Sequence, residues 1–191
     1  DSDIETSKIF YKSNREILSY THNENNFVDF DRDRLLFHMS SSEGSCICEG
    51  DINNDGFLDL YIGGSKGYPG SIYLWDKNKF KKYNYQILDD DKESEDTDCL
   101  FFDANSDGRI DLYVSSGGNE YSIYSPELRD RLYFNFNNDF KKSEQILPAG
   151  LFESSSVVKN IDLDSDGDQD LFVGTRLIPQ KYGLPSNGYL L

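Results

Sequence analysis

A segment of fourteen residues occurs three times in this chain of 191 residues, rich in Asp each time. The copies align without gaps, as DINNDGFLDLYIGG from Asp51, DANSDGRIDLYVSS from Asp103 and DLDSDGDQDLFVGT from Asp162. Their first residues are 52 and 59 positions apart (103 − 51 and 162 − 103). Self-similarity at such a spacing is typical of arrays in which each repeat is one supersecondary unit packed on the next. We therefore expect the chain to fold as a series of similar units.

Strand-like residues surround every copy. β-branched and aromatic residues that end at Gly or Ser, a pattern typical of strands, occupy residues 58–62, 110–114 and 169–173. Shorter runs of the same kind precede the copies at residues 46–48, 99–102 and 156–158. Further runs follow the first two copies at residues 71–75 and 131–135, and each leads through a turn to another at 79–82 and 139–142. The repeat is thus a four-stranded antiparallel unit, the size of a large propeller blade.

These units predict an all-β fold: a β-propeller-type array of four-stranded antiparallel blades, or partial propeller, in a single domain over residues 1–191. The 13 Tyr and 13 Phe suit strands better than helices. We place repeat 1 at residues 45–97, repeat 2 at 98–155 and an incomplete repeat 3 at 156–191. Residues 1–44, with strand-like pieces at 7–10 and 35–37, lead into the first blade or end a preceding one. The charge run 89–96 predicts a solvated connection.

The chain is strongly acidic, with 35 Asp and Glu against 19 Lys and Arg and a formal net charge of −16. Such a surface repels phosphate backbones, which excludes nucleic acid as a partner. An aromatic content of 14% argues against disorder. Binding cations is the remaining way to tolerate so many carboxylates, and the Asp residues of the three copies are spaced for it.

Calcium takes about six to eight oxygen ligands. One short loop supplies them from side chains at its first, third, fifth and ninth positions and from the backbone carbonyl at its seventh. Gly at the sixth position permits the sharp turn around the ion. We therefore predict three Ca²⁺ sites. Their ligands are Asp51, Asn53, Asp55, the carbonyl of Phe57 and Asp59; Asp103, Asn105, Asp107, the carbonyl of Arg109 and Asp111; and Asp162, Asp164, Asp166, the carbonyl of Asp168 and Asp170.

Other cation sites fit less well. A helical EF-hand needs a bidentate Glu at its twelfth position, where these copies have Ile62, Val114 and Val173. Magnesium prefers a tight octahedron that keeps several waters, and the loops lack the Cys or His of a zinc site. Asx turns capped by their own carboxylates are the alternative without a metal, although those carboxylates would repel one another. Residues 29–33 resemble a loop start, but Arg34 stands where Gly is needed.

Nothing in the sequence indicates catalysis. Cys46, Cys48 and Cys99 form no disulfide framework, and we expect buried free thiols. His22 is expected to be a structural hydrogen-bonding residue, and no G-x-S-x-G, H-E-x-x-H or phosphate-binding loop occurs. No signal peptide or transmembrane segment is visible, and the chain reads as a piece of a longer protein. Tyrosines in loop-like stretches that could serve an interface are Tyr68, Tyr121, Tyr124 and Tyr182.

The Asp loops resemble those of FG-GAP and VCBS repeats in integrin-α-type β-propellers. A closer likeness is to the cartilage-acidic-protein-like (ASPIC/UnbV-associated) family of secreted repeat proteins. It is carried by residues 26–31, 42–44, 94–96, 116–118, 130–133 and 171–174. The resemblance implies a propeller whose loops hold calcium for structure and whose surface binds other molecules, and it implies no catalytic residue. Three loops are too few for a closed ring of about seven blades, so remaining blades of the parent chain or another subunit should cover the open sheets.

We therefore expect a calcium-binding extracellular module for adhesion or ligand binding, which meets a protein or glycan ligand at the cell surface. Extracellular calcium modules bind the ion at roughly 10⁻⁴ to 10⁻³ M, which suits the calcium level outside cells. Two alternatives remain open: a polysaccharide-active enzyme built on a propeller, and a structural subunit of a surface assembly.

Overall fold

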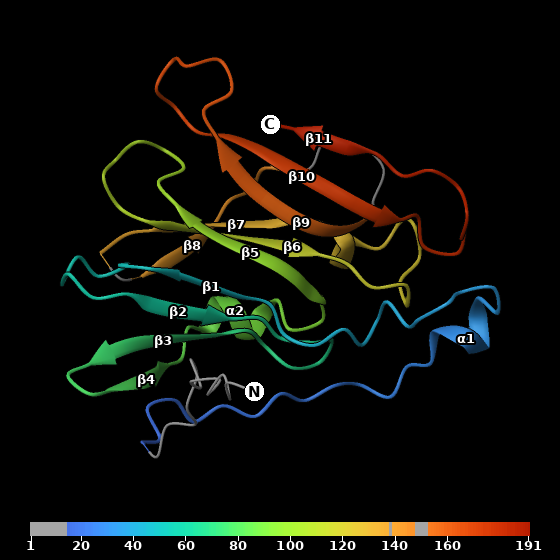
Figure 1. Cartoon of the computed structure of the whole chain (residues 1–191), viewed down its shortest axis with the longest axis horizontal. Coiled ribbons are helices and arrows are strands. Elements are labelled where there is room, and N and C mark those ends of the chain that lie inside the picture. The colour runs from blue at the N-terminus through green and yellow to red at the C-terminus, as the bar shows by residue number, and fades with distance from the viewer. Residues whose placement is uncertain (1–14, 138, 148–152) are drawn as a thin grey trace, which may run out of the picture.

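Three antiparallel sheets make up the computed structural model, which describes residues 15–137, 139–147 and 153–191 (Figure 1). The first sheet pairs its strands in chain order: β1 (Ile47–Gly50), β2 (Asp59–Ile62), β3 (Ser71–Asp76) and β4 (Lys79–Tyr83). The second sheet does the same with β5 (Asp96–Phe102), β6 (Asp111–Ser116), β7 (Arg131–Asn135) and β8 (Phe140–Lys142). The third sheet consists of β9 (Ser154–Ile161), β10 (Asp170–Leu177) and β11 (Gly188–Leu190).

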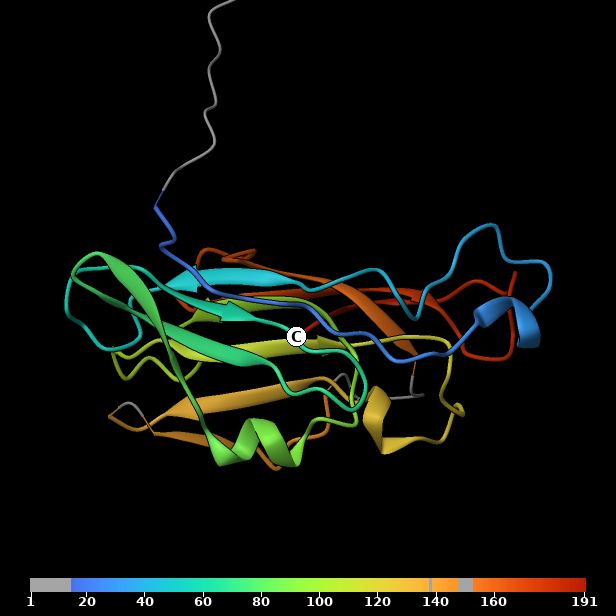
Figure 2. The same cartoon turned by 90° about the horizontal axis from the view of Figure 1, so that it is seen from below.

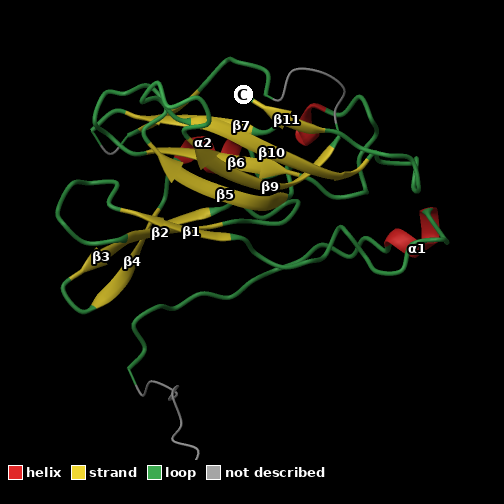
Figure 3. Ribbon diagram, turned by 45° about the horizontal axis from the view of Figure 1, so that its top comes forward, coloured by secondary structure: helices red, strands yellow, loops and turns green. Residues whose placement is uncertain are grey.

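The three sheets are stacked in the order of the chain, as Figures 1 and 3 show. The first strands of consecutive sheets meet, because β1 lies against β5 and β5 lies against β9. The predicted fold class is therefore confirmed: the chain is an all-β partial propeller of antiparallel sheets, two of them four-stranded.

Two apolar cores hold the stack together, one between each pair of neighbouring sheets. The core between the first and second sheets includes Tyr61, Ile72, Leu112, Val114 and Tyr133. The core between the second and third sheets includes Phe102, Tyr113, Leu132, Val158, Leu171 and Val173. The second sheet is therefore apolar on both faces. Each such side chain contributes roughly 1.5–3 kcal/mol when it is fully buried.

The helices are short and lie outside the stack. They are α1 (Asp29–Arg32), α2 (Gln86–Asp90) and the 3₁₀ turn η1 (Pro126–Leu128). Among the described residues, no helix has both the length and the apolar character to cross a membrane.

The segment before β1 runs along the first sheet, as the blue chain in Figures 1 and 2 shows. The amide of Phe80 in β4 donates a hydrogen bond to the carbonyl of Ile17 (2.7 Å). The ring of Tyr20 packs edge-on against Tyr73 of β3, with centroids 6.4 Å apart. This segment thus covers part of the first sheet's face that points away from the second sheet.

Most predicted strands occur where the sequence places them; β7, for example, covers the predicted residues 131–135. The prediction of a strand at residues 35–37 is wrong. Those residues form turn and coil, with Leu35 79% and Phe37 92% exposed, and none of the described strands pairs with them. The piece at residues 7–10 lies outside the described residues. The first strands β5 and β9 begin at Asp96 and Ser154, two residues before the limits predicted for repeats 2 and 3.

The prediction of a solvated connection over residues 89–96 is wrong for its last three residues. Ser94, Glu95 and Asp96 are buried, and Asp96 opens strand β5. Burial of Asp96 is possible because it receives hydrogen bonds from Tyr61 and Gly64 and pairs with Arg131. A charge run in the sequence does not reveal such partners.

Candidate metal centre

The three Asp loops share one backbone conformation. Each connects the first strand of a sheet to the second, and all three lie at the same end of the stack (left in Figure 1). The fourth and sixth positions of every loop have positive φ. Gly adopts such a φ at little cost, whereas other residues do so less readily, which explains Gly at the sixth position. The residues concerned are Asn54, Ser106 and Ser165 at the fourth position and Gly56, Gly108 and Gly167 at the sixth.

In the first loop, the side chains predicted as ligands turn inward and accept hydrogen bonds from the loop's own amides. Asp51 accepts from the amides of Asp55 (3.0 Å) and Gly56 (2.8 Å). Asn53 Oδ1 also accepts from the amide of Asp55 (3.0 Å), and Asp55 Oδ1 accepts from that of Phe57 (2.9 Å). Each of these oxygens has two lone pairs, so an oxygen that accepts one hydrogen bond can still bind a cation.

The second loop repeats this arrangement. Asp103 accepts from the amides of Asp107 (3.1 Å) and Gly108 (2.8 Å), and Asn105 Oδ1 accepts from that of Asp107 (3.1 Å). Asp107 in turn accepts from the amide of Arg109 (2.9 Å). The Arg109 side chain folds back onto the loop, with Nη2 2.5 Å from Asp107 Oδ2. One carboxylate of this loop is therefore already paired with a cation from the protein.

The ninth position is buried in the first two loops and ties the loop to the rest of its sheet. Asp59 accepts hydrogen bonds from the amides of Ile52 (3.3 Å) and Trp75 (2.8 Å). Asp111 accepts from those of Ala104 (3.0 Å) and Asn135 (2.8 Å). Burial raises the pKa of both carboxyl groups above their ordinary value, and these hydrogen bonds oppose the rise. The role of either side chain as a cation ligand stays a prediction.

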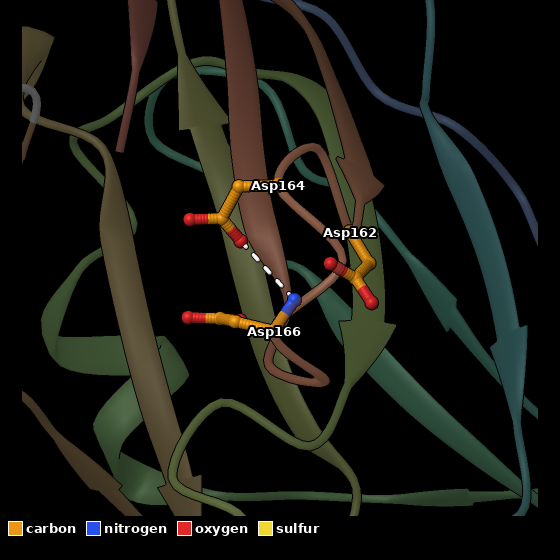
Figure 4. A group of neighbouring side chains, drawn as sticks. All are labelled: Asp162, Asp164 and Asp166. Carbon is orange, nitrogen blue, oxygen red and sulfur yellow. Dashed lines mark hydrogen bonds between the residues drawn. The ribbon is translucent and has the colours of Figure 1, made fainter.

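The third loop gathers three carboxylates. Oxygens of Asp162, Asp164 and Asp166 all lie within 4.8 Å of one another, the one such group of His, Cys, Asp or Glu found in the described ranges (Figure 4). The amide of Asp166 donates to Asp164 Oδ1 (3.3 Å), and that of Asp168 donates to Asp166 Oδ1 (3.1 Å). Asp170 lies outside the group and accepts from the amide of Leu163 (2.8 Å).

The donors of these loops fit a hard cation. The side chains that converge offer only oxygen, from carboxylates and from the amides of Asn53 and Asn105, as calcium prefers. The carbonyls of Phe57, Arg109 and Asp168 follow at the seventh position of each loop. In the third loop, hydrogen bonds from Asp168 lower the pKa of Asp166, and the same contact raises that of Asp168. A cation would relieve the repulsion among such carboxylates.

A buried polar network between the sheets was not predicted from the sequence. Asp96 accepts hydrogen bonds from the hydroxyl of Tyr61 (2.7 Å) and the amide of Gly64 (2.7 Å). It also forms an ion pair with Arg131, and the two side chains are only 2% and 5% exposed. The neighbouring Asp130 accepts from the hydroxyl of Tyr113 (2.9 Å). The one signal in the sequence was that Asp96, Asp130 and Arg131 lie in segments that carry the family resemblance.

The side chain of Asn135 joins the first two Asp loops. The side-chain amide of Asn135, at the end of β7, donates to the carbonyls of Ile52 (2.8 Å) and Ile110 (3.1 Å). Its backbone carbonyl accepts from Arg109 Nε (2.9 Å). One side chain thus fixes the first and second loops relative to each other.

Two further expectations concern thiols and histidine. Cys46, Cys48 and Cys99 are free; Cys99 is buried and the other two are half-buried. His22 hydrogen-bonds with Ser45 Oγ (2.5 Å) and Glu24 Oε1 (2.5 Å), as expected of a structural histidine.

Of the four tyrosines that could serve an interface if exposed, Tyr121 does not meet that condition. That side chain is 4% exposed, and its hydroxyl donates to the carbonyl of Glu93 (2.6 Å). Tyr68, Tyr124 and Tyr182 are exposed.

A family model described as FG-GAP-like repeat matches residues 51–114 and 103–173, which together span more than half of the chain. Each match begins at the first Asp of one Asp loop and reaches the strand that follows the next. No curated protein matches. The chain belongs to the FG-GAP-like repeat family.

Proposed function

We propose that this chain is a calcium-binding extracellular module for adhesion or ligand binding, in which calcium has a structural role. The observation that carries the proposal is the group of Asp162, Asp164 and Asp166, on a loop conformation that all three repeats share. Three carboxylates that converge on one point, with oxygen donors alone, are suited to Ca²⁺.

The proposed ligands are the oxygens of the first, third, fifth and ninth positions of each loop, with the backbone carbonyl of the seventh. An ion held this way joins the start of the loop to the strand after it. Because binding requires the folded loop, its free energy adds to that of folding. The proposal therefore makes calcium a stabiliser of the sheet stack.

The finer identity is also part of the proposal. We place the chain in the cartilage-acidic-protein-like (ASPIC/UnbV-associated) group of FG-GAP and VCBS repeat proteins, outside the cell, where calcium is abundant. Its partner would be a protein or glycan at the cell surface, contacted in part by the exposed Tyr68, Tyr124 and Tyr182. We assign it no catalytic activity, and a screen of glycan substrates with and without calcium tests this part.

Thermal unfolding tests the calcium proposal. We expect the melting temperature to be higher at a few millimolar Ca²⁺ than in chelator. Sites with affinities of extracellular modules contribute about 1–2 kcal/mol each at that concentration. For a chain of this size each kcal/mol raises the melting temperature by roughly 2–4 °C. Equal melting temperatures with and without calcium would sink the proposal.

Asp164→Ala tests whether Asp164 is a calcium ligand or only a structural residue. In calcium the variant should lose about one third of the rise, because one site of three is removed. In chelator it should unfold no earlier than the wild type, because it removes one of three crowded carboxylates. The matched control is Asp76→Ala, which removes an exposed carboxylate outside the loops and should keep the full calcium effect.

A further inference from the structure

A cavity with mainly apolar walls lies between the segment before β1 and the connection from β10 to β11. We call it the apolar cavity; its apolar walls are Leu36, Phe37, Leu177, Tyr182, Leu184 and Pro185. Its volume is about 410 Å³, within the range of roughly 300–1,000 Å³ that small-molecule sites occupy. Figures 1 and 2 show α1 and the β10–β11 connection at the end of the stack opposite the Asp loops.

The apolar cavity combines buried side chains with others that are open to water. Leu36 and Leu177 are buried, whereas Phe37 is 92% exposed, Leu184 56% and Tyr182 40%. A ligand with an apolar or aromatic body would remove the three exposed side chains from water, which is favourable in proportion to the apolar area covered. The cavity is therefore suited to such a body.

A second cavity, rich in basic side chains, adjoins the first. We call it the cationic cavity; its volume is about 380 Å³, its basic side chains are Arg32, Arg34 and Lys181, and it shares Tyr182 with the apolar cavity. Arg34 and Lys181 are exposed, and neither side chain forms an ion pair within the described part of the chain. Their charges are therefore available to an anion.

The basic residues of the two cavities are unusual in so acidic a chain. The cavities are lined by four of its 19 Lys and Arg, because Arg176 lines the apolar cavity, but by one of its 35 Asp and Glu, Asp33. Arg176 is ion-paired with Glu43, which also lies 3.4 Å from His38. The excess positive charge therefore comes from the cationic cavity, and it favours a ligand of negative charge.

Asn119, which is 1% exposed, holds the walls of the cavities together. Its side-chain amide nitrogen donates to Asp33 Oδ2 (2.7 Å). Its side-chain oxygen accepts from Arg32 Nη2 (3.3 Å) and from the backbone amide of Gln180 (3.4 Å). One buried side chain thus fixes the segment after α1 relative to the β10–β11 connection, so both cavities are preformed, as ligand sites usually are.

We propose that the two cavities together bind a small organic acid. Its apolar or aromatic body lies among Phe37, Tyr182 and Leu184, and its carboxylate or sulfonate lies beside Arg34 and Lys181. Hydrogen bonds between ionised groups are stronger than neutral ones, so these two side chains select the acid. The site goes beyond the proposed protein or glycan partner, and it lies at the opposite end of the stack from the Asp loops, so it does not depend on calcium.

Larger anions suit this end of the molecule less well than a small acid. The formal net charge of −16 repels an anionic polysaccharide or an anionic membrane, and the repulsion grows with the number of charges on the partner. A ligand with one or two charges meets mainly the basic groups beside it, because at physiological salt the more distant carboxylates are screened beyond about 8 Å. Charge thus favours the small acid.

The test compares two fluorescent probes that differ by one sulfonate. Anilinonaphthalene sulfonate has the apolar body and the acid, whereas phenylnaphthylamine has the body alone. We expect the sulfonate probe to bind the folded chain at one site, at least about fivefold more tightly than the neutral probe, because only the sulfonate pairs with Arg34 and Lys181. Fluorescence titrations in chelator and in millimolar calcium should give the same affinities, which keeps this test separate from that of the Asp loops.

Variants locate the site and separate its charges from its apolar walls. Arg34→Ala with Lys181→Ala should weaken the sulfonate probe at least about fivefold and leave the neutral probe unchanged, because only charge is removed. Tyr182→Ala should weaken both probes, because this ring lines both cavities. The matched control, Lys79→Ala with Lys92→Ala, removes the same charge from exposed positions outside the cavities and should change neither affinity.

Three results would overturn the proposal. One is equal affinity of the two probes for the wild-type chain, because the acid would then contribute nothing. Another is a sulfonate probe that binds the Arg34→Ala, Lys181→Ala variant as tightly as the wild type. The third is co-sedimentation of the chain with vesicles of phosphatidylcholine and phosphatidylserine that the same variant abolishes, because the occupant would then be an anionic membrane.

Discussion

At the scale of single residues, two buried carboxylates add side-chain hydrogen bonds to the backbone pairing of the stack. Asp96 and Asp130 are both less than 5% exposed, and each accepts a hydrogen bond from a Tyr hydroxyl, Tyr61 of β2 and Tyr113 of β6. A buried acceptor without its donor costs more than the hydrogen bond itself contributes when made. These side chains therefore select one arrangement of the sheets, beyond what apolar packing specifies.

Tyr61→Phe tests this role. The substitution removes the hydroxyl that donates to Asp96 Oδ2 (2.7 Å) and leaves the ring in place. We expect the free energy of unfolding, from urea denaturation, to fall by roughly 1–3 kcal/mol. Tyr68→Phe, at a side chain that is 45% exposed, is the control and should change it little. Equal stability of Tyr61→Phe and wild type would show that the contact has no net effect.

Asp130 should make stability depend on pH. Burial, only partly offset by hydrogen bonds from Ser116 and Tyr113 and by Arg131, raises its pKa in the folded protein to about 7. In the unfolded chain an Asp titrates near pH ~4. Between these values the folded state keeps a proton that the unfolded state releases, so stability falls as pH rises from about 4 to 7 and then levels off.

The check is urea denaturation of wild type and Asp130→Asn at several pH values between 4 and 8, in chelator so that the Asp loops bind no ion. Wild type should lose stability relative to the variant as pH rises through this window. Glu95, whose pKa burial raises to about 8, acts in the same direction but is present in both proteins. A constant difference between the two proteins would contradict the assignment.

At the scale of elements, repetition made the strands and loops predictable. The Gly at the sixth position and the strand-like run after it recur in every copy, and the structure has loop and strand at each. Elements without a repeat were missed. Helix α2 lies between β4 and β5, and the expected strand at residues 35–37 is turn and coil. Local sequence could not decide these cases, because the contacts that do come from other parts of the chain.

The candidate site, too, could be predicted from the sequence only in part. The spacing of Asp, Asn and Gly sufficed to find the loops. It could not show that Asp59 and Asp111 are buried and bonded to the third strand of their sheets, because Trp75 and Asn135 lie 16 and 24 residues further along the chain. Nor could it show that the third loop alone brings three carboxylates together.

Asn135→Ala tests how the first two loops are connected. The side-chain amide of Asn135 is 1% exposed and bonds the carbonyls of Ile52 and Ile110, so its loss leaves buried acceptors without their donor. We expect a destabilisation of roughly 1–3 kcal/mol, measured by urea denaturation. Asn160→Ala, which removes an exposed side-chain amide bonded to Gln169, is the control and should have little effect. Similar losses in both variants would mean that Asn135 has no special role.

At the scale of the whole molecule, the stack is a short array whose two ends differ. The first sheet is partly covered by the segment around Tyr20, while the third sheet exposes Phe172 and Leu190. In repeat arrays, stability is close to a sum of repeat terms and nearest-neighbour interfaces. The three Asp loops lie within the repeats, so calcium bound there would strengthen each unit.

The central claim is that each Asp loop is a calcium site, and the number of ions bound tests it most directly. Equilibrium dialysis of the chain against millimolar Ca²⁺, followed by metal analysis, should give three ions per chain, one for each of the loops at Asp51, Asp103 and Asp162. Replacing those three residues together by Ala should abolish the binding. A wild-type chain that binds no calcium at millimolar concentration would contradict the account.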